Sequence, residues 1–385
     1  ERVPLLTKQT QENEPQAAPD ETYTLIAEDL LFAVEHANAA PYPAMAPESH
    51  GHANLWAAKA LLGRVYLYYT GYYNKTDLLG LVAKADALAH LEDVIAESGH
   101  GLVDSYYDLW PAAASYKAAL DGDSISASTY AGETNKEVVF AIKYTYTSNY
   151  DGNTDGNHWM VMNGLRNQSV PQYGYGNGWG ACTVLPGFYE AFGPNDTRRD
   201  ASIMAIEQEG IDFQEINDVK EYTGYFTKKY TPTCDADGNS MAENYGAPNF
   251  MIGQYQDYFV IRYADVLLMA AELGSPDAVS YVNQVRQRAN PQAEALAQAD
   301  KDLIFEERRK EFAFEGIWYW DMLRYDHTLD YAANRVEYSG TVLDGGVEEE
   351  KFIQGDNLKK TRGLFQIPYN QITLSNGVLT QNEGW

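Results

Sequence analysis

The sequence predicts a mainly α-helical protein built from pairs of helices, with a large irregular, loop-rich insertion and short β-hairpins. Two observations support this fold class. Apolar residues recur at helical spacing near both ends of the chain, and the stretch between these ends is rich in Gly, Asn, Asp and Tyr. A chain of 385 residues can bury a large core, and its length alone permits one to three domains.

The first pair of helices is expected before residue 100. Residues 53–69 place Leu55, Leu62, Val65 and Tyr69 at helical spacing, and residues 81–98 form a second amphipathic stretch that Gly99 would end. The first stretch contains a Leu-Gly-x-x-Tyr pattern. Together the two helices resemble one tetratricopeptide unit of about 34 residues.

The helical pattern returns after residue 257. Residues 258–273 are long and apolar, and Ser275 with Pro276 is a plausible N-cap for a helix at residues 277–289. Residues 302–325 form a third helical block, in which Glu306 precedes Lys310 by four positions, a pair that supports a helix.

The middle of the chain, residues 145–257, differs from both ends. A short β-like run at residues 138–142 precedes it, and the stretch itself carries few apolar periodicities. Irregular stretches of this length inside a compact protein are usually functional surfaces. We therefore expect the helices to be the scaffold and the insertion to be the working part.

Composition narrows the class of protein. The net charge of −27, with no stripe of Lys and Arg, argues against nucleic-acid binding. Two cysteines are too few for a disulfide framework or a zinc cluster, and spacing leaves open whether Cys182 and Cys234 form a bridge. Thirty Tyr and seven Trp against 13 Phe favour surfaces that grip amphipathic ligands such as sugars, although Tyr also packs between helices.

No catalytic pattern stands out, and we predict that the protein is not an enzyme. Glycoside hydrolysis needs two carboxylates across the bond, one with a raised pKa. The densest acidic group shares one helix with Arg308, Arg309 and Lys310, which favours ionised structural pairs, and Asp196 and Asp200 flank two arginines in the same way. This group comprises Glu306, Glu307, Glu311 and Glu315.

Metal binding is a weak alternative to simple turns, and no cofactor is expected. Asp151, Asn153 and Asp155 stand at the first, third and fifth positions of a calcium-like loop, but Met162 occupies the position of the bidentate Glu. The run from Asp235 to Asn239 repeats only the start of such a loop. Both are more simply turns rich in Asp and Asn, with a structural calcium ion as the alternative.

The ligand-binding candidates alternate aromatic rings with Gly and Asn. Glycine would bring the backbone close to a ligand and let rings project, while Asn would bond sugar hydroxyls. Packing of these rings on the protein's own helices is the open alternative. The candidates in the insertion are Asn157, Trp159, Tyr173, Tyr175, Asn177 and Trp179, and a second aromatic group is Tyr72 and Tyr73.

Several blocks, in order, resemble the SusD/RagB family of nutrient-binding outer-membrane lipoproteins of Bacteroidetes. Together they cover nearly the whole chain. The blocks are residues 3–7, 23–30, 60–69, 135–144, 186–192, 196–200, 261–272, 282–289, 306–316, 367–372 and 381–385, with Asn376.

The resemblance implies a single domain of tetratricopeptide-like helix pairs. The helical scaffold would occupy about residues 20–120 and 258–330, the ligand-binding insertion about 145–257, and a loop-rich C-terminal segment residues 331–385. It also implies that the protein is exposed at the surface of the outer membrane and is anchored there by a lipidated N-terminal cysteine. That cysteine and the family's first helices have no counterpart in this chain.

The function that the resemblance implies is capture of a glycan and its handover to a SusC-like, TonB-dependent transporter. Two alternatives remain. A RagB-like lid protein would carry peptide, and the negative charge would steer basic peptides toward it. A tetratricopeptide-type adaptor would bind protein segments, but it predicts continuous regular repeats, which the long insertion opposes.

Overall fold

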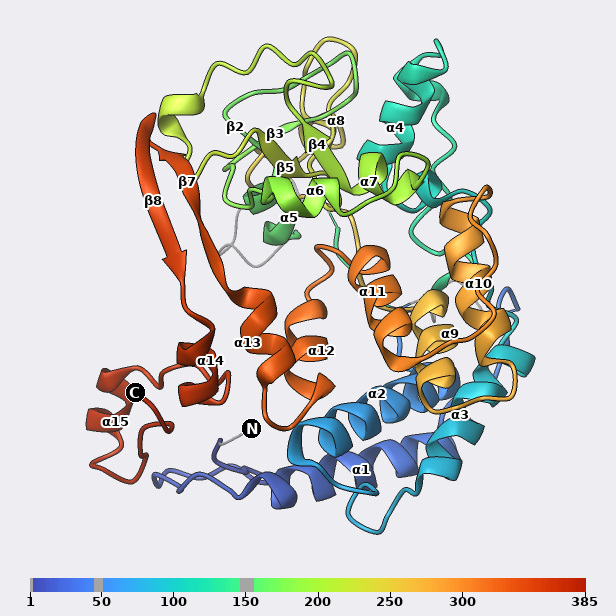
Figure 1. The fold of residues 1–385 in the computed structure, drawn as a ribbon, viewed down its shortest axis with the longest axis vertical. Coiled ribbons are helices and arrows are strands. Elements are labelled where there is room, and N and C mark those ends of the chain that lie inside the picture. The colour runs from blue at the N-terminus through green and yellow to red at the C-terminus, as the bar shows by residue number, and fades with distance from the viewer. Residues whose placement is uncertain (1–2, 45–50, 146–155) are drawn as a thin grey trace.

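A computed structural model describes residues 3–44, 51–145 and 156–385 (Figure 1). Stacked helices fill its lower right, where α1 packs on α2, α2 on α3 and α9 on α10. The mainly helical fold of helix pairs predicted from the sequence is confirmed. The stacked helices are α1 (Pro19–His36), α2 (Leu55–Tyr73), α3 (Lys84–Glu97), α9 (Tyr263–Glu272), α10 (Ala278–Ala289) and α11 (Lys301–Glu311).

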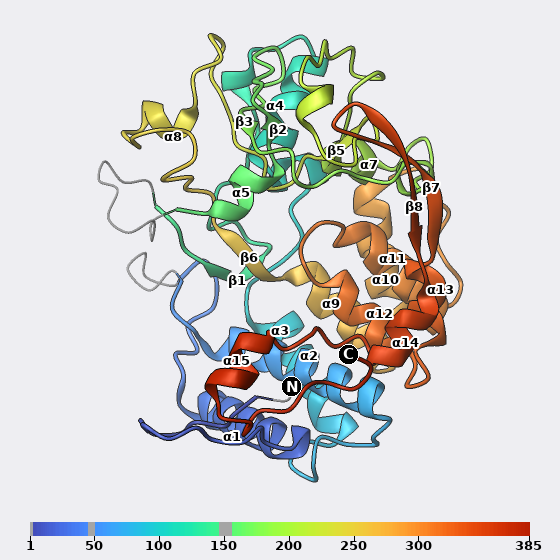
Figure 2. The same ribbon diagram turned by 90° about the vertical axis from the view of Figure 1, so that its left-hand side faces the viewer.

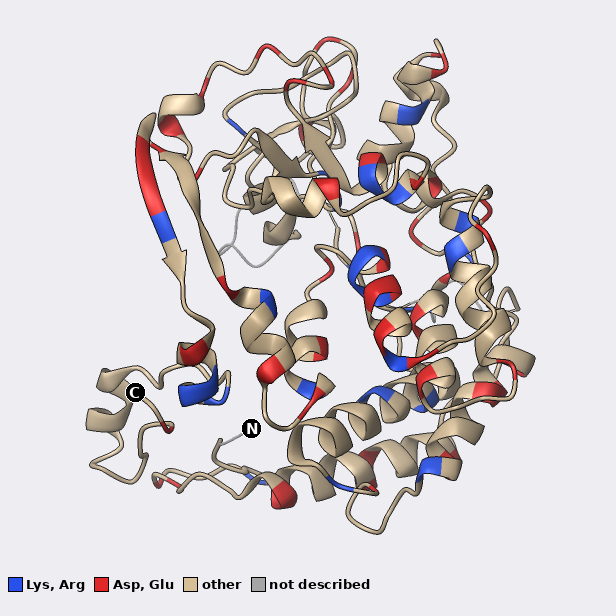
Figure 3. Cartoon of the chain, in the orientation of Figure 1, with Lys and Arg blue, Asp and Glu red and all other residues tan. Residues whose placement is uncertain are grey.

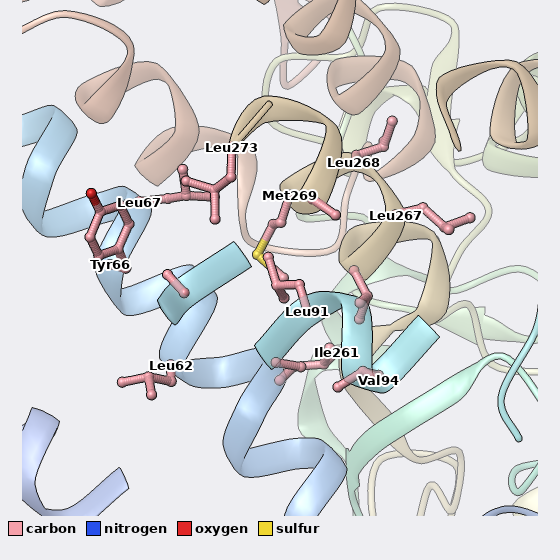
Figure 4. Packing of buried hydrophobic residues seen from close by; sticks show 14 of the residues in the cluster. Leu62, Tyr66, Leu67, Leu91, Val94, Ile261, Leu267, Leu268, Met269 and Leu273 are labelled. Carbon is pink, nitrogen blue, oxygen red and sulfur yellow. The ribbon is translucent and has the colours of Figure 1, made fainter. Parts of the chain in front are cut away.

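The core of the stack lies where α2, α3 and α9 meet. Leu62, Leu91 and Met269 are fully buried, and Figure 4 shows Met269 of α9 directly beside Leu91 of α3. Gly63 explains the Leu-Gly-x-x-Tyr pattern, because a Cβ at this position would lie 2.8 Å from a methyl carbon of Leu91. The glycine lets α3 approach α2 closely enough to close the core.

The apolar run at residues 258–273 is not one helix. Strand β6 (Tyr258–Arg262) comes first and pairs antiparallel with β1 (Val138–Ile142), and α9 follows directly. Phe259 and Ile261 are buried and alternate with less buried neighbours, as in a strand. A short apolar run does not separate strand from helix by periodicity alone, which is why the sequence pattern predicted a helix here.

The block at residues 302–325 is likewise two elements, α11 and α12 (Trp318–Tyr325). Phe314 and Gly316 adopt positive φ between them, which ends one helix before the next begins. The predicted pair of Glu306 with Lys310 is replaced by ion pairs of Glu306 with Arg309 and Arg335.

The predicted N-cap of α10 is also shifted. Asp277, not Ser275, is the N-cap residue, and Ser275 Oγ instead accepts a hydrogen bond of 3.0 Å from Asp277 N.

The irregular insertion occupies the upper part of Figure 1 and contains only short elements. Their own core includes Tyr175, Phe226 and Tyr230, with Trp110 from the segment before α4 (Pro111–Leu120). The elements are α5 (His158–Asn163), β2 (Leu165–Arg166), β3 (Asn177–Gly178), α6 (Pro186–Glu190), α7 (Thr197–Ser202), β4 (Ile203–Ala205), β5 (Tyr225–Thr227) and α8 (Met241–Asn244).

The C-terminal segment is more regular than the loop-rich stretch predicted. A hairpin of two seven-residue strands leads from α13 to the upper part of the molecule (Figure 1). There Tyr222 and Leu343 exchange two backbone hydrogen bonds, of 2.7 and 3.2 Å. The elements are α13 (Asp330–Val336), β7 (Tyr338–Asp344), β8 (Val347–Ile353), α14 (Gly355–Thr361) and α15 (Tyr369–Leu374).

A buried ion cluster joins the helices to the upper part. Acidic and basic residues interleave along α11 (Figure 3), and the carboxylate of Glu311 accepts hydrogen bonds from Arg288 at 2.6 Å, Arg262 at 2.9 Å and Arg198 at 3.4 Å. Arg262 and Arg288 also bond Glu137, just before β1. These five side chains, all almost inaccessible, are called the Glu311 cluster below.

The carboxylates of α11 are therefore structural ion pairs, as the sequence predicted. Burial alone would raise the pKa of Glu311, but Arg288, Arg262 and Arg198 outweigh it and hold the pKa at about 2. No helix of the described residues is both long and apolar enough to cross a membrane.

Glu311→Gln should destabilise the fold by about 3–5 kcal/mol at pH 7, because it leaves three buried arginines short of a counter-charge. A folded pKa lowered from 4.5 to about 2 stabilises the protein fully above pH 4.5 and loses that effect as the pH falls toward 2. The difference between wild type and variant in urea unfolding should therefore shrink across this window. Glu306→Gln, at an exposed ion pair, is the matched control and should cost less than about 1 kcal/mol.

Gly71→Ala should also destabilise, by about 1–3 kcal/mol, because the added Cβ would lie 2.2 Å from the backbone oxygen of Arg324 and push α2 away from α12. Gly187→Ala in α6, where an added Cβ meets nothing within 4 Å, is the control and should be neutral or slightly stabilising. Equal melting temperatures for the two variants would contradict close packing of α2 on α12.

Candidate functional site

Trp159 projects from the first turn of α5. Asn157 is the N-cap of this helix: its Oδ1 accepts from Trp159 N at 3.0 Å, and its Nδ2 donates to Gln256 O at 2.8 Å. Asn157 is buried, whereas the Trp159 side chain is 38% exposed. Asn157, a predicted ligand contact, thus lies beneath the surface and holds the backbone that carries Trp159.

Trp179 lies beside the same helix. Its backbone N donates to Val161 O at 2.8 Å, and Ala181 N donates to Met162 O at 2.9 Å. The Trp179 side chain is 39% exposed. Two large aromatic side chains are therefore presented from one hydrogen-bonded frame formed by α5 and the strand β3.

The glycines of this region bring protein backbone against protein backbone, whereas the sequence pattern predicted an approach to a ligand. A Cβ at Gly178 would lie 2.5 Å from Val161 O, and one at Gly176 would lie 2.9 Å from Thr233 O. Gly164 meets Gly178 in the same way, with 2.9 Å to its Cα. No larger residue fits these three positions without moving the frame.

A polar depression of about 250 Å³ lies beside β3. Asn177 lines it, and Trp179 directly follows the end of β3, two positions after Asn177. Two of the other lining residues belong to the calcium-like run from Asp235 to Asn239, and the rest come from segments that carried no binding signal in the sequence. The other lining residues are Asn167, Ser169, Gly238, Asn239, Ser240, Glu243 and Phe250.

A further exposed ring lies close in the chain to this depression, and no sequence motif singled it out. Tyr245, 48% exposed, directly follows α8, the helix that contributes Glu243. Figure 2 shows α5, α8 and β3 on the same side of the upper part of the molecule. We call Trp159, Trp179, Tyr245 and the depression around Asn177 the Trp/Asn face.

The turn from Asp235 to Asn239 is held by its own hydrogen bonds. The carboxylate of Asp235 accepts from Asn244 Nδ2 at 2.8 Å and from the backbone N of Asp237 and Asn239. The bonds from Asn244 and Asn239 lower the pKa of Asp235. This arrangement is the Asp/Asn-rich turn predicted as the simpler interpretation.

The other calcium-like stretch lies outside the described residues. In the part of the chain that the structure describes, no three His, Cys, Asp or Glu side chains form a group suited to a metal ion. The stretch left outside contains Asp151, Asn153 and Asp155.

Tyr173 and Tyr175 belong to a buried cluster beneath the Trp/Asn face. Both hydroxyls donate to Glu209, Tyr175 to its carboxylate and Tyr173 to its backbone oxygen, each at 2.9 Å. Lys228 Nζ lies 3.1 Å from Glu209 Oε1 and 3.5 Å from the ring centre of Tyr116. Burial raises the pKa of Tyr175 and lowers that of Lys228. Tyr173 and Tyr175 therefore pack inside the upper part of the molecule, which is the alternative to ligand binding that the sequence left open.

Tyr72 and Tyr73 lie elsewhere. Tyr72 is buried on α2, and its hydroxyl donates to Arg362 O at 2.8 Å. Its ring packs edge-on against Tyr73 at 4.8 Å. Figures 1 and 2 both place α2 in the lower part of the molecule and α5 in the upper part, so this second aromatic group does not join the Trp/Asn face.

The two cysteines, whose pairing the sequence left open, are free thiols. Cys234 Sγ donates to Tyr175 O at 3.1 Å, and burial raises the pKa of this thiol to about 12. A thiol held in this form is a weak nucleophile and is a packing residue here.

The fold matches known proteins throughout its length. Surface glycan-binding protein A from Bacteroides thetaiotaomicron, solved with laminarihexaose, superimposes with a TM-score of 0.72 at 22% identity, covering 99% of this chain and 73% of that one. The chain is 29% identical over 213 residues to SusD-like protein P2 of Formosa agariphila, which covers 49% of this chain and 39% of the relative.

A SusD-like protein of Bacteroides ovatus is 25% identical over 353 residues, covering 86% of this chain and 56% of its own length. The chain thus spans well under two thirds of both curated relatives. The family model described as the SusD family matches residues 136–385, which include the insertion, β6, α9 to α12 and the C-terminal hairpin. The chain belongs to the SusD family.

Proposed function

We propose that this protein binds a glycan at the Trp/Asn face and releases it chemically unchanged. The observation that carries the proposal is the pair of tryptophans on one frame. Trp159 and Trp179 leave about two fifths of their large apolar surfaces in water, although α5 and β3 are tightly hydrogen-bonded. Exposed aromatic surface on a fixed backbone is typical of a binding site.

The chemistry of the Trp/Asn face suits a sugar. Indole rings stack on the apolar face of a pyranose, and the amide and hydroxyl groups of Asn177, Asn239 and Ser240 can bond its hydroxyls. The solved protein of the same fold carries laminarihexaose, which supports an oligosaccharide as the ligand class. Peptide is the alternative cargo.

The positions of two groups of carboxylates support binding without catalysis. Glu311 and its neighbours on α11 are ion-paired below the surface. Burial raises the pKa of Glu133 to about 7, the range of a general acid, but Glu133 lines a cavity of only about 50 Å³. Its carboxylate also accepts hydrogen bonds from the Tyr130 hydroxyl and from Asp257 N, so it is engaged within the structure.

The cellular role that we propose is that of the family. The protein would be anchored at the outer-membrane surface and would hand its glycan to a SusC-like, TonB-dependent barrel. Co-purification of the two proteins from outer membranes in mild detergent is expected. Recovery of this protein without a barrel partner would count against the handover and would leave the glycan site untouched.

Trp159→Ala and Trp179→Ala should each weaken glycan binding by about 1–2 kcal/mol, roughly 5- to 30-fold, because each removes one stacking surface. Calorimetric titration with laminarihexaose and a panel of soluble polysaccharides measures the loss. Phe32→Ala, at an exposed ring on α1 in the helical stack, is the control and should bind like wild type.

Glycan binding that survives both tryptophan substitutions would overturn the location of the site. Silence across the glycan panel, combined with heat from basic peptides, would replace the glycan with peptide as the cargo.

A further inference from the structure

A second cavity, of about 460 Å³, lies in the helical part of the molecule. It opens between α1, α2 and the junction of α11 with α12. Helices α1 and α2 lie in the lower part of Figures 1 and 2, whereas α5 and β3 lie in the upper part. Its size is that of a small-molecule site. The lining residues are Tyr23, Ile26, Arg64, Val65, Tyr68, Arg308, Gly316, Ile317, Trp320, Asp321 and Arg324.

The walls of this cavity are aromatic and aliphatic. Trp320, 44% exposed, meets Tyr68 edge-on at 6.0 Å between ring centres, and Tyr68 stacks on Tyr23 at 6.5 Å. Ile26 and Val65 complete the apolar lining. Such walls offer ring faces to a ligand that has an apolar face of its own.

The floor is polar but electrically balanced. Arg308 bonds Asp321 at 2.8 Å and Asp265 at 2.6 Å. Arg324 bonds Asp321 at 2.8 Å and Glu272 at 2.5 Å. With Arg64, three guanidinium groups therefore face three carboxylates, and no net positive charge is left to attract an anion.

Arg64 is the charged residue of the floor that still has an unused hydrogen-bond donor. Its Nη2 donates to Val260 O at 2.8 Å and to Asp265 at 2.5 Å, while its Nε has no hydrogen-bond partner among the described residues. The Arg64 side chain is 23% exposed, in contrast to its buried partner Asp265. It can donate to a ligand oxygen, and because its charge is already matched, a neutral oxygen suffices.

We propose that this cavity binds an uncharged pyranose unit of a neutral oligosaccharide, with Trp320 against the ring face and Arg64 donating to a hydroxyl or ring oxygen. The inference rests on the proposed glycan-binding function and deepens it by naming the ligand class and a second site. The net charge of −27 supports the same class, since it repels acidic glycans.

The test uses the whole chain labelled with 5-fluorotryptophan, whose seven tryptophans give separate ¹⁹F signals that single Trp→Phe variants assign. Laminarihexaose is the neutral probe and an oligogalacturonide the acidic one. The signals of Trp159 and Trp179 report the proposed function, and the signal of Trp320 reports the cavity. Laminarihexaose should shift the Trp320 signal saturably.

Val65→Phe fills the cavity without removing an ion pair and should weaken the Trp320 response about ten-fold or more, with the responses of Trp159 and Trp179 unchanged. Phe32→Ala, on the same layer of helices but outside the cavity, should leave all three responses intact.

Each outcome separates the two proposals. A Trp320 signal that stays still while Trp159 and Trp179 respond overturns the cavity site and leaves the proposed function standing. A Trp320 response to the oligogalacturonide alone overturns the neutral ligand class. Silence of all three signals with both probes overturns glycan binding and, with it, the cavity inference.

Discussion

The Glu311 cluster is the interaction on which the rest of the structure depends. Arginines from β6, α7 and α10 converge on one carboxylate at the end of α11, and Tyr106, Lys229 and Arg262 all donate to the backbone oxygen of Glu311. Donors and positive charge at a helix C-terminus satisfy its free carbonyls and oppose its dipole. Tyr106 and Lys229 belong to the upper part of the molecule. Their hydrogen bonds to the C-terminal end of α11 therefore hold the upper part against the stacked helices.

The charged residues of α11 stabilise the fold, and the residues that we propose for ligand binding are a different set. The carboxylates of α11 are held ionised by arginines and carry no ligand, whereas the Trp/Asn face that we propose for binding has aromatic, amide and hydroxyl groups. The charges of α11 thus serve the interior, while the depression of the Trp/Asn face is mainly neutral and contains one carboxylate, that of Glu243. This division agrees with a binding protein that must release its ligand.

The sequence predicts those parts of the fold that depend on neighbouring residues. Helices at α2, α3 and α10 follow from local periodicity. The ionised state of Glu311 was predicted, but its partners Arg288, Arg262 and Arg198 lie 23, 49 and 113 positions away in the chain and not beside it on α11. Parts that depend on distant residues were not predictable. Strand β6 forms by pairing with β1, which lies more than a hundred positions earlier in the chain. Tyr175 is buried in contact with Glu209 and Lys228, which are also distant in the sequence.

Trp159 and Trp179 were predicted as site residues from their motif, but which aromatic rings stay exposed is decided by tertiary packing. The cavity beside Trp320 is lined by residues of four helices, α1, α2, α11 and α12, and no local pattern marks it.

The frame beneath Trp159 and Trp179 has a consequence for how such proteins diversify. Its path is set by backbone hydrogen bonds and by Gly164, Gly176 and Gly178, none of which involves an indole ring. Exchanging either tryptophan for another side chain leaves the path of the chain intact. Ligand preference can thus drift over generations through a few outward-facing positions, while the glycines and the amide ladder are retained. If the Trp/Asn face is the binding site that we propose, a scaffold of this kind admits new ligands without a new fold.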